Sequence, residues 1–473
     1  MNGAPEPPIQ LADRGTFEPF NDDLRSRDPL GYPDYMKALI KAGERSGSDE
    51  SVTTGRARIK GHEVELAIFD FAFMGGSMGE AAGERLARAM ERAAERGVPF
   101  VLRTATGGAR MQEGMRSLIQ MPKVVAARMT LSESHQPFIA LLGHPTTGGV
   151  FASVASLADI TVAEDEATIG FAGPRVAQRV TGEPLPPGSH TATSALDNGM
   201  VDDVVSPETA PHRIGDVLDC LAPDDPEPAP EIPPEAPPDG APDAWEAVQR
   251  ARRDKHIDLS SFDRKVTLHG DRAGSDAGAL GSWLVRHGGR RFVLLDTAGA
   301  PLWPSGFRKA LRLVDLASRL NVPVVTLVDT PGADPSARSE KEGIASLIAR
   351  LTEKILAAPV PILSVVTGEG GSGGALAFAA ADVLIAYEHS IFSVIGPEGA
   401  AEILWKDASR APEAARALKL TAHDLGRLGI ADQVVAGSPS ATSLTQVVTY
   451  HLERMPVGDG LSQRRRERWR RTW

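Results

Sequence analysis

A chain of 473 residues is too long for one hydrophobic core, so its length predicts two or three domains. The net charge of −11 and the pI near 5.6 disfavour a general nucleic-acid binder, and the single Cys220 excludes a disulfide framework and a cysteine zinc site. The sequence has no membrane-spanning stretch and no secretory signal, so we expect a cytoplasmic protein without membrane contact.

Residues 1–50 read as a loop-rich lead-in with one short helix in DYMKALIKAG (34–43). The first domain, residues 51–220, has an amphipathic helix over 83–97, an apolar strand over 98–104 and a glycine turn in ATGGARMQEG (105–114). A second apolar strand, PFIALLGH, then leads into a glycine pair, Gly148-Gly149, at the start of a helix. This order is typical of an α/β fold.

Residues 221–244 are proline-rich and acidic and have few large apolar side chains, so they read as a semi-extended linker. The second domain, residues 245–473, repeats the order of the first. A helix over 306–321 is followed by a strand over 322–330 and the turn PGADPSARSEKEG (331–343). The strand PILSVV then leads into TGEGGSGGALAF (367–378).

Matched landmarks in the two domains keep nearly constant separations, which indicates an internal duplication. Val98 and Val322 differ by 224 positions (322 − 98). Matching Gly148-Gly149 with Gly373-Gly374 gives 225 (373 − 148), and it places Thr147 opposite Ser372. The Gly-Pro pairs that begin at Gly173 and Gly396 differ by 223 (396 − 173).

The stretch TGEGGSGGALAF permits three interpretations. Residues 368–373 match a Gly-x-Gly-x-x-Gly dinucleotide fingerprint, and residues 370–374 match a Gly-x-Ser-x-Gly nucleophile elbow. The third interpretation is a pair of backbone N–H groups, those of Gly373 and Gly374, that stabilise an oxyanion at the start of a helix. Close packing of helix on strand is the simpler structural explanation of two glycines.

The first two interpretations fit poorly. The helix in ALAFAAAD is too short for a dinucleotide crossover, and the first domain keeps the glycine pair without the fingerprint. Asp382 and His389 follow Ser372 in the order of a hydrolase triad, but they lie too close to it in sequence.

A second glycine turn in each domain favours the oxyanion interpretation. Gly107, Gly108 and Ala109 follow the first strand of one domain, and Gly332 and Ala333 follow its counterpart in the other. Glycine lets a backbone N–H approach a ligand closely. Two such turns can converge on one thioester oxygen, at about 3–4 kcal/mol per well-placed donor.

At these residues the sequence resembles the carboxyltransferase subunits of bacterial acetyl-CoA carboxylase. The first domain resembles the β subunit through FDFAFMGGSMGEAAGERLARA (69–89), TGGARMQEGMRSLIQMPK (106–123), PTTGGV (145–150) and IGFAGPRV (169–176). The second resembles the α subunit through LHGDR (268–272), GFRKALRL (306–313), DTPGA (329–333), GEGGSGGALAF (368–378) and VIGPEGAAEILWK (394–406). The resemblance implies two tandem crotonase-like domains of ββα superhelix architecture.

The resemblance also implies a reaction. Carboxybiotin on a separate carrier protein gives up CO2, its ureido group takes a proton from an acyl-CoA, and the enolate attacks CO2; acetyl-CoA would give malonyl-CoA. The first domain would hold coenzyme A and the second biotin, with a biotin carboxylase and a biotin carboxyl carrier protein as partners. An acyl-CoA half facing a biotin half across a subunit boundary implies a homodimer or larger homo-oligomer.

Site residues follow from the same resemblance. The oxyanion pairs would be Gly148 with Gly149 and Gly373 with Gly374. Substrate-binding residues would come from the neighbouring turns: Gly107, Gly108, Ala109, Arg110, Gly173, Arg175, Gly332 and Ala333. Arg110 and Arg175 would either bind CoA phosphates or brace their own loops.

Departures from the family keep alternatives open. The chain has no four-cysteine zinc ribbon, TAGAPLWPS (297–305) replaces a basic loop, and Pro335-Ser336 replaces Pro-Gly. No metal is therefore expected. A malonyl-thioester decarboxylase and a non-catalytic scaffold subunit remain alternative functions. The charge of the arginine-rich C-terminus, residues 463–473, could suggest RNA or an acidic partner, but the resemblance favours a subunit-contact helix.

Overall fold

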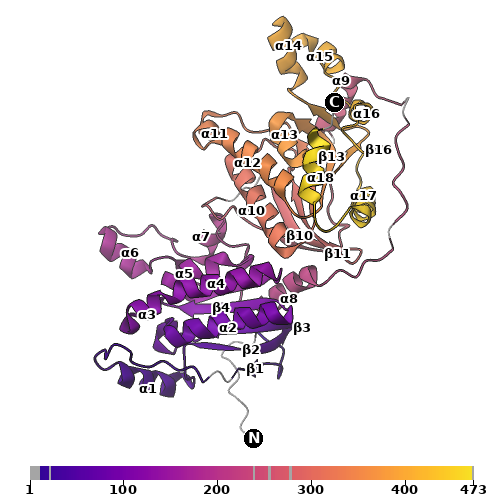
Figure 1. Ribbon diagram of the computed structural model, residues 1–473. Helices are drawn as coiled ribbons and strands as arrows, with labels where there is room; N and C mark the ends of the chain where they lie inside the picture. The colour runs from indigo at the N-terminus through magenta and orange to yellow at the C-terminus, as the bar shows by residue number, and fades with distance from the viewer. Residues whose placement is uncertain are drawn as a thin grey trace. The chain divides into compact units, whose positions relative to one another are not determined.

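The computed structural model describes residues 11–20, 23–228, 230–237, 240–253, 257–275 and 280–470. The chain divides into two compact units, Met1–Leu221 (unit 1) and Ala222–Trp473 (unit 2), each with its own sheet and helices. Figure 1 shows unit 1 in indigo to magenta and unit 2 in the colours that follow. Each unit is described by itself.

Unit 1 has an eight-stranded sheet in the order β1-β2-β3-β4-β5-β6-β8, with β7 paired to β5. The strands are β1 (Glu18–Pro19), β2 (Val52–Ile59), β3 (His62–Phe69), β4 (Phe100–Thr106), β5 (Phe138–Thr147), β6 (Ile160–Glu164), β7 (Ile169–Gly170) and β8 (Asp203–Val205). The helices are α1 (Tyr35–Ser46), α2 (Glu80–Arg96), α3 (Met115–Leu118), α4 (Gln120–Glu133), α5 (Gly148–Ser153), α6 (Pro174–Thr181), α7 (Ala192–Asp197) and α8 (Ala210–Leu221), with 3-10 turns at Met74–Gly76, Met111–Glu113 and Ala155–Leu157.

Unit 2 repeats this topology in the order β16-β14-β13-β12-β11-β10-β9, with β15 paired to β13. Its strands are β9 (Arg264–Thr267), β10 (Gly281–His287), β11 (Arg290–Asp296), β12 (Val324–Thr330), β13 (Ile362–Gly371), β14 (Val383–Tyr387), β15 (Ile391–Ser393) and β16 (Gln433–Val435). Its helices are α9 (Ala244–Arg253), α10 (Pro304–Leu320), α11 (Ala337–Lys341), α12 (Ile344–Ala357), α13 (Ser372–Ala379), α14 (Pro397–Trp405), α15 (Ala411–Leu418), α16 (Ala422–Arg427), α17 (Ala441–Arg454) and α18 (Leu461–Arg470), with a 3-10 turn at Ala408–Arg410.

The central strands β4 and β12 pair in parallel with both of their neighbours. Every residue of β4 and of β12 is buried. Such strands need apolar residues on both faces, which is why the sequence shows continuous apolar runs instead of strict alternation. Helix α2 ends at Gly97 and α10 at Asn321, both with left-handed backbone, so the predicted helices end as expected.

The duplication is confirmed in register. Phe100 pairs with Phe138 in unit 1, and Val324 pairs with Ile362 in unit 2, a shift of 224 in both strands (324 − 100 and 362 − 138). The pairing is interrupted once in each unit and resumes at Thr106 in one and Thr330 in the other. The offset therefore stays at 224 up to the glycine turns.

This register corrects the sequence match at the turns by one residue. Thr106 pairs with Thr146, and Thr330 pairs with Gly370. The left-handed residue that opens the helix is Gly148 in α5 and Ser372 in α13, with φ values of 72° and 57°. Gly148 therefore corresponds to Ser372, and Gly149 corresponds to Gly373. Identical glycine letters misled the alignment because the ladder, rather than the residue type, sets the register.

The proline-rich segment expected as a linker is instead hydrogen-bonded along unit 2. The N–H of Asp225 donates to the Gly289 carbonyl at 3.0 Å. Farther on, the Ala236 N–H donates to Val434, and the Ala436 N–H donates to Pro234, both at 2.9 Å. Backbone pairing needs no apolar side chains, so composition alone could not reveal this attachment. Residues 229 and 238–239 lie outside the described part.

The arginine-rich C-terminal helix also packs on its own unit. Arg465 of α18 is buried, and its guanidinium donates to the Asp382 carboxylate and to the carbonyls of Ala358 and Val360. Trp469 donates its indole N–H to the Ala381 carbonyl. These contacts hold the helix on unit 2, and the subunit contact implied by the resemblance stays a prediction. Residues 471–473 lie outside the described part.

Cys220 is buried and carries no disulfide. In the described ranges, no group of three or more His, Cys, Asp or Glu side chains is placed to hold a metal ion. None of the described helices is both long enough and apolar enough to cross a bilayer.

Candidate functional site

The two predicted glycine turns of unit 1 lie in direct contact. A Cβ built on Gly108 would stand 3.1 Å from the Gly148 Cα and 3.2 Å from the Gly149 N. A Cβ built on Gly148 would stand 2.9 Å from the Gly107 carbonyl oxygen. Gly108 also has a φ of 111°, which only glycine adopts readily. Glycine is therefore required at both points where these backbones touch.

Local hydrogen bonds fix the shape of the turn after β4. The Gly108 N–H donates to the Thr106 hydroxyl at 3.0 Å, and the Gly107 N–H donates to the Gly75 carbonyl at 2.9 Å. Met78 then pairs with the turn on both sides, donating to the Gly108 carbonyl and accepting from the Arg110 N–H. The turn is thus held by the 74–78 segment and by its own threonine.

Unit 2 builds the same arrangement from different residues. The Gly332 N–H donates to the Thr330 hydroxyl at 3.1 Å, and Leu302 forms the bridge to Ala333. A Cβ on Gly371 would stand 2.0 Å from the Pro331 carbonyl oxygen, and one on Gly374 would stand 2.4 Å from the Ala333 N. The turns after β12 and β13 therefore pack even more closely than their unit 1 counterparts.

Each unit leaves backbone donors at this meeting point. The described residues supply no hydrogen-bond acceptor to the N–H groups of Ala109 and Gly149 in unit 1, or to those of Ala333 and Gly373 in unit 2. Gly149 and Gly373 are second residues of α5 and α13, where the first four N–H groups lack an intrahelical partner. Such donors can bind a negatively charged oxygen.

The space beside these donors differs between the units. A Cβ on Gly149 would stand 3.1 Å from the Met121 sulfur and 3.8 Å from the Ala109 Cβ. A Cβ on Gly373 would meet no atom within 4 Å. Helices α4 and α12 keep the 224 offset, so Ala345 takes the position of Met121. The unit 2 site is therefore more open beside its helix.

Arg110, one of the predicted substrate-binding residues, is fully buried and does not face a ligand. Its guanidinium pairs with Glu50 and donates to the Ser77 carbonyl at 2.7 Å. Burial alone would lower the pKa of Arg110, but the Glu50 charge more than offsets this and raises it. Of the two roles considered for Arg110, phosphate binding is therefore wrong, and the side chain braces its own loop.

Gly173 and Arg175 lie at the start of α6, just after Phe171, whose carbonyl accepts from the Gly148 N–H at 2.9 Å. Gly173 is the N-cap of this helix, none of whose residues is buried, and Arg175 is exposed. A Cβ on Gly173 would meet no atom within 4 Å. Arg175 can therefore reach an anion in solution, and its role in phosphate binding stays a prediction.

The nucleophile-elbow interpretation fails on geometry. Asp382 is engaged by the buried Arg465, and the His389 ring contacts Arg250 at 3.1 Å. Neither is paired with Ser372, whose side chain is exposed. The dinucleotide interpretation also loses support, because α13 is only eight residues long and ends at Ala379.

Sequence reasoning missed a second group of charged residues near the unit 2 turn. Arg252 of α9 donates to both Glu369 in β13 and Glu398 in α14, at 2.9 Å and 2.7 Å. Burial alone would lower the pKa of Arg252, but these two carboxylates more than offset it and raise it. Glu369 and Arg252 are 117 residues apart, so no local pattern could pair them.

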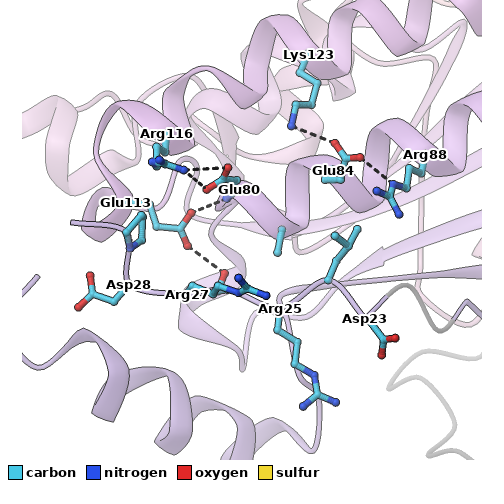
Figure 2. A pocket seen from close by; sticks show the side chains of 14 residues that line it. Asp23, Arg25, Arg27, Asp28, Glu80, Glu84, Arg88, Glu113, Arg116 and Lys123 are labelled. Carbon is cyan, nitrogen blue, oxygen red and sulfur yellow. Dashed lines mark hydrogen bonds and ion pairs between the residues drawn. The ribbon is translucent and has the colours of Figure 1, made fainter. Parts of the chain in front are cut away.

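A cavity of about 540 Å³ opens in unit 1 between the lead-in and helices α2, α3 and α4. Its lining balances basic and acidic side chains. Figure 2 shows Arg116 paired with Glu80, and Lys123 and Arg88 paired with Glu84. Glu113, which Figure 2 shows beside Glu80, also lines the cavity; the glycine turns do not.

Comparison with known proteins identifies the fold and the family. Residues 31–262 match the carboxyl transferase domain model, and residues 243–454 match the acetyl co-enzyme A carboxylase carboxyltransferase-like model. The structure of the transcarboxylase 12S hexamer with methylmalonyl-coenzyme A bound superposes with a TM-score of 0.77 at 25% identity. It covers 95% of this chain, and this chain covers 90% of it.

Two curated relatives extend the match over nearly the whole chain. The acetyl-coenzyme A carboxylase carboxyl transferase subunits beta/alpha of Salinispora arenicola are 43% identical over 456 residues, 90% of this chain and 81% of theirs. A probable biotin-dependent acyl-coenzyme A carboxylase beta3 subunit of Mycobacterium bovis is 34% identical, over 91% of this chain and 88% of its own. The tandem glycine-turn units therefore belong to the family of acetyl-coenzyme A carboxylase carboxyl transferase subunits beta/alpha.

Proposed function

We propose that the two glycine turns are two oxyanion sites of a biotin-dependent carboxyltransferase. In this proposal unit 1 binds the thioester oxygen of an acyl-CoA through the N–H groups of Gly149 and Ala109. Unit 2 binds the ureido oxygen of biotin through the N–H groups of Gly373 and Ala333. Gly148 and Gly374 serve as close-packing positions that hold each pair of turns together.

The proposed carboxyl transfer depends on backbone N–H groups more than on side chains. Carboxybiotin supplies CO2 and, once decarboxylated, a base for the acyl α-proton. The chain's task is to stabilise the enolate oxygen that develops on the thioester and the negative charge on the ureido oxygen. Two fixed N–H donors per site suit both tasks, because preorganised dipoles need no rearrangement during the reaction.

The observation that carries the proposal is the meeting of two turns in each unit, with unpaired donors at the contact. The described residues offer no acceptor to these four N–H groups, and the space beside Gly373 can admit a ligand atom. Close packing alone explains the glycines at the backbone contacts, whereas the oxyanion role also gives a use to the accessible donors at the same place.

The proposal includes partners and setting. A biotin carboxylase and a biotin carboxyl carrier protein would supply carboxybiotin, and the chain would act as a homodimer or larger homo-oligomer. The name of the mycobacterial relative, a beta3 subunit of a biotin-dependent carboxylase, supports such partners. We place the reaction in the cytoplasm, because the buried Cys220 forms no disulfide, as suits a reducing compartment.

The test is an assay of the purified chain with free biotin and acetyl-, propionyl- or malonyl-CoA. We expect biotin-dependent transfer of the carboxyl group from malonyl-CoA, with release of acetyl-CoA. Release of acetyl-CoA at the same rate without biotin would favour a decarboxylase. Binding of a biotinylated carrier protein without turnover of any thioester would favour a scaffold subunit.

A further inference from the structure

A buried ionic cluster lies behind the unit 1 turn and includes residues of the N-terminal lead-in. Arg110, Glu50 and Glu113 are 0–1% exposed, and Tyr35 is 1% exposed. Glu113 accepts a hydrogen bond from the Tyr35 hydroxyl at 2.5 Å, and its carboxylate lies 3.0 Å from the Ser26 hydroxyl. Ser26 also lies 2.5 Å from Glu50. The lead-in therefore reaches into the core of the cluster.

The cluster has more negative than positive charge, so its carboxylates also need hydrogen bonds from neutral donors. Two buried carboxylates, Glu50 and Glu113, share one guanidinium, and a buried carboxylate is costly unless its oxygens are hydrogen-bonded. Arg110 pairs closely with Glu50 but lies 3.3 Å from Glu113. The Tyr35 hydroxyl gives Glu113 a shorter bond than Arg110 does, and the one hydroxyl hydrogen of Ser26 faces Glu50 at 2.5 Å and Glu113 at 3.0 Å.

Glu113 in turn controls the backbone on the far side of the turn. Its second oxygen accepts from the Glu80 N–H at 2.5 Å, at the first residue of α2. A Cβ on Gly79 would stand 2.5 Å from the Glu113 carboxylate, so the two are tightly packed. Met78, one residue before, makes the two backbone bonds that fix Gly108 and Arg110.

The protonation states of Tyr35 and Glu50 determine which group donates and which accepts in these hydrogen bonds. Burial raises the pKa of the Tyr35 phenol, so it remains a donor near neutrality. Burial alone would raise the pKa of Glu50, but Arg110 more than offsets this and lowers it, which keeps the carboxylate charged.

We infer that Ser26 and Tyr35 are positioning residues for the acyl-CoA site, acting through Glu113 and Arg110 on the turn that presents the Ala109 N–H. This inference rests on the proposed function of that turn. Unit 2 offers no equivalent among its described residues: Asp334 stands at the position of Arg110, and Ala337 at that of Glu113. Among the described residues, the cluster that the lead-in joins thus belongs to the unit 1 turn.

The test compares Tyr35→Phe with Tyr387→Phe in the full chain. Tyr387 is equally buried, and its hydroxyl bonds Ser443 in unit 2, so both variants delete one buried phenol hydroxyl. Carboxyl transfer from malonyl-CoA to free biotin gives kcat and both KM values, and amide hydrogen exchange reports on residues 107–110. Ser26→Ala and Ser26→Thr form a second pair, in which threonine restores the hydroxyl.

For Tyr35→Phe we expect kcat to fall roughly tenfold with little change in the KM for biotin, and exchange at 107–110 to accelerate. Ser26→Thr should keep more activity than Ser26→Ala, and Tyr387→Phe should leave both readouts near those of the parent chain. An equal loss of kcat in Tyr387→Phe, or unchanged kcat in Tyr35→Phe, would overturn the inference. If the parent chain transfers no carboxyl group, the proposed function fails, and unchanged exchange in Tyr35→Phe then overturns the positioning role by itself.

Discussion

The turn after β4 and the turn after β12 occupy the same place in two copies of one fold, yet they are supported differently. In unit 1 the residue after the turn is Arg110, fully buried in an ionic cluster. In unit 2 it is the half-buried Asp334, whose carboxylate accepts from the hydroxyls of Ser336 and Ser339. Both turns nevertheless keep the same threonine bond and the same bridge, from Met78 or from Leu302.

A second residue difference distinguishes the turn after β4 from the turn after β12. Gly79, packed against the Glu113 carboxylate, corresponds to Trp303 in unit 2, where the Arg338 guanidinium lies 5.4 Å from the indole ring centre. A buried charge cluster in one copy is thus replaced by a half-exposed cation–π pair in the other. The comparison teaches that glycines and a threonine set the backbone of the turn, while the side chains behind it were free to diverge.

The largest expected effect tests whether the side chains behind the two glycine turns contribute differently to stability. Arg110→Met should lower the free energy of unfolding by about 3–5 kcal/mol, because it leaves Glu50 and Glu113 buried without their guanidinium. Asp334→Ala should cost much less, since Asp334 is only half-buried and its partners are neutral hydroxyls, so the substitution leaves no buried charge without a partner. Urea denaturation of both variants measures the difference. Equal losses would mean that the two turns are supported alike.

The next effect concerns the donors that the two turns share. Gly149→Val and Gly373→Val should each reduce carboxyl transfer by about 10²-fold or more, because the new side chain fills the space before the N–H donors. Gly373→Val should fold well, since its Cβ meets open space, whereas Gly374→Val would strike the Ala333 N. Circular dichroism and thermal melting provide the folding control.

Mixing the two inactive variants sharpens the result. If a working site combines unit 1 of one chain with unit 2 of another, subunit exchange should restore part of the activity, because one site in a mixed dimer escapes both changes. The exchange itself is verified by mass spectrometry of differently tagged chains. No return of activity after verified exchange would place both turns of a site in one chain.

We expect the stability of the two units to depend differently on pH, because their titrating groups differ. Burial lowers the pKa of His451 in unit 2 to about 4, from 6.5, and its ring contacts Gln433. Between about pH 6.5 and 4, the unfolded chain binds a proton at His451 and the folded chain does not. The free energy of unfolding therefore falls as pH drops over this range. Glu50 in unit 1 has a lowered pKa, so its contribution to the free energy of unfolding is lost only below the ordinary glutamate pKa of 4.5.

Unit 2 should therefore lose stability first on acidification. Amide hydrogen exchange at pH 7, 5.5 and 4.5, followed separately in β4 and β14, measures this order. His451→Gln should flatten the dependence in unit 2 between pH 6.5 and 4.5 and leave unit 1 unchanged. A steeper loss in unit 1 over that range would contradict the assignment.

The smallest effect concerns the space beside each helix. Met121→Ala should widen the unit 1 site and raise activity towards longer acyl-CoA relative to acetyl-CoA by about fivefold, a scale typical of one or two methylenes in a pocket. Ala345→Met should narrow the unit 2 site and raise the KM for biotin, with the KM for acyl-CoA unchanged. The two KM values, measured for both variants, show whether each side chain bounds the site assigned to it.

The sequence by itself determined the duplication, the α/β class and the pairing of glycine turns. These rest on local signals: apolar runs for buried strands, amphipathic spacing for α2 and α10, and glycine where backbones meet. The motifs that matched the carboxyltransferase family are of the same kind, since each lies within one short stretch. The residues Gly149, Ala109, Gly373 and Ala333 could therefore all be named before the fold was known.

The tertiary structure decided what depends on contacts between distant residues. It moved the match at the glycine turns by one position, because ladder register cannot be read from identical letters. It showed that Arg110, a candidate phosphate ligand, is buried and braces its own loop. Its partner Glu50 lies 60 residues away in sequence, so no local pattern could reveal the pair. It joined Tyr35 to Glu113 across 78 residues, a pairing without local periodicity that only the packed chain could bring about.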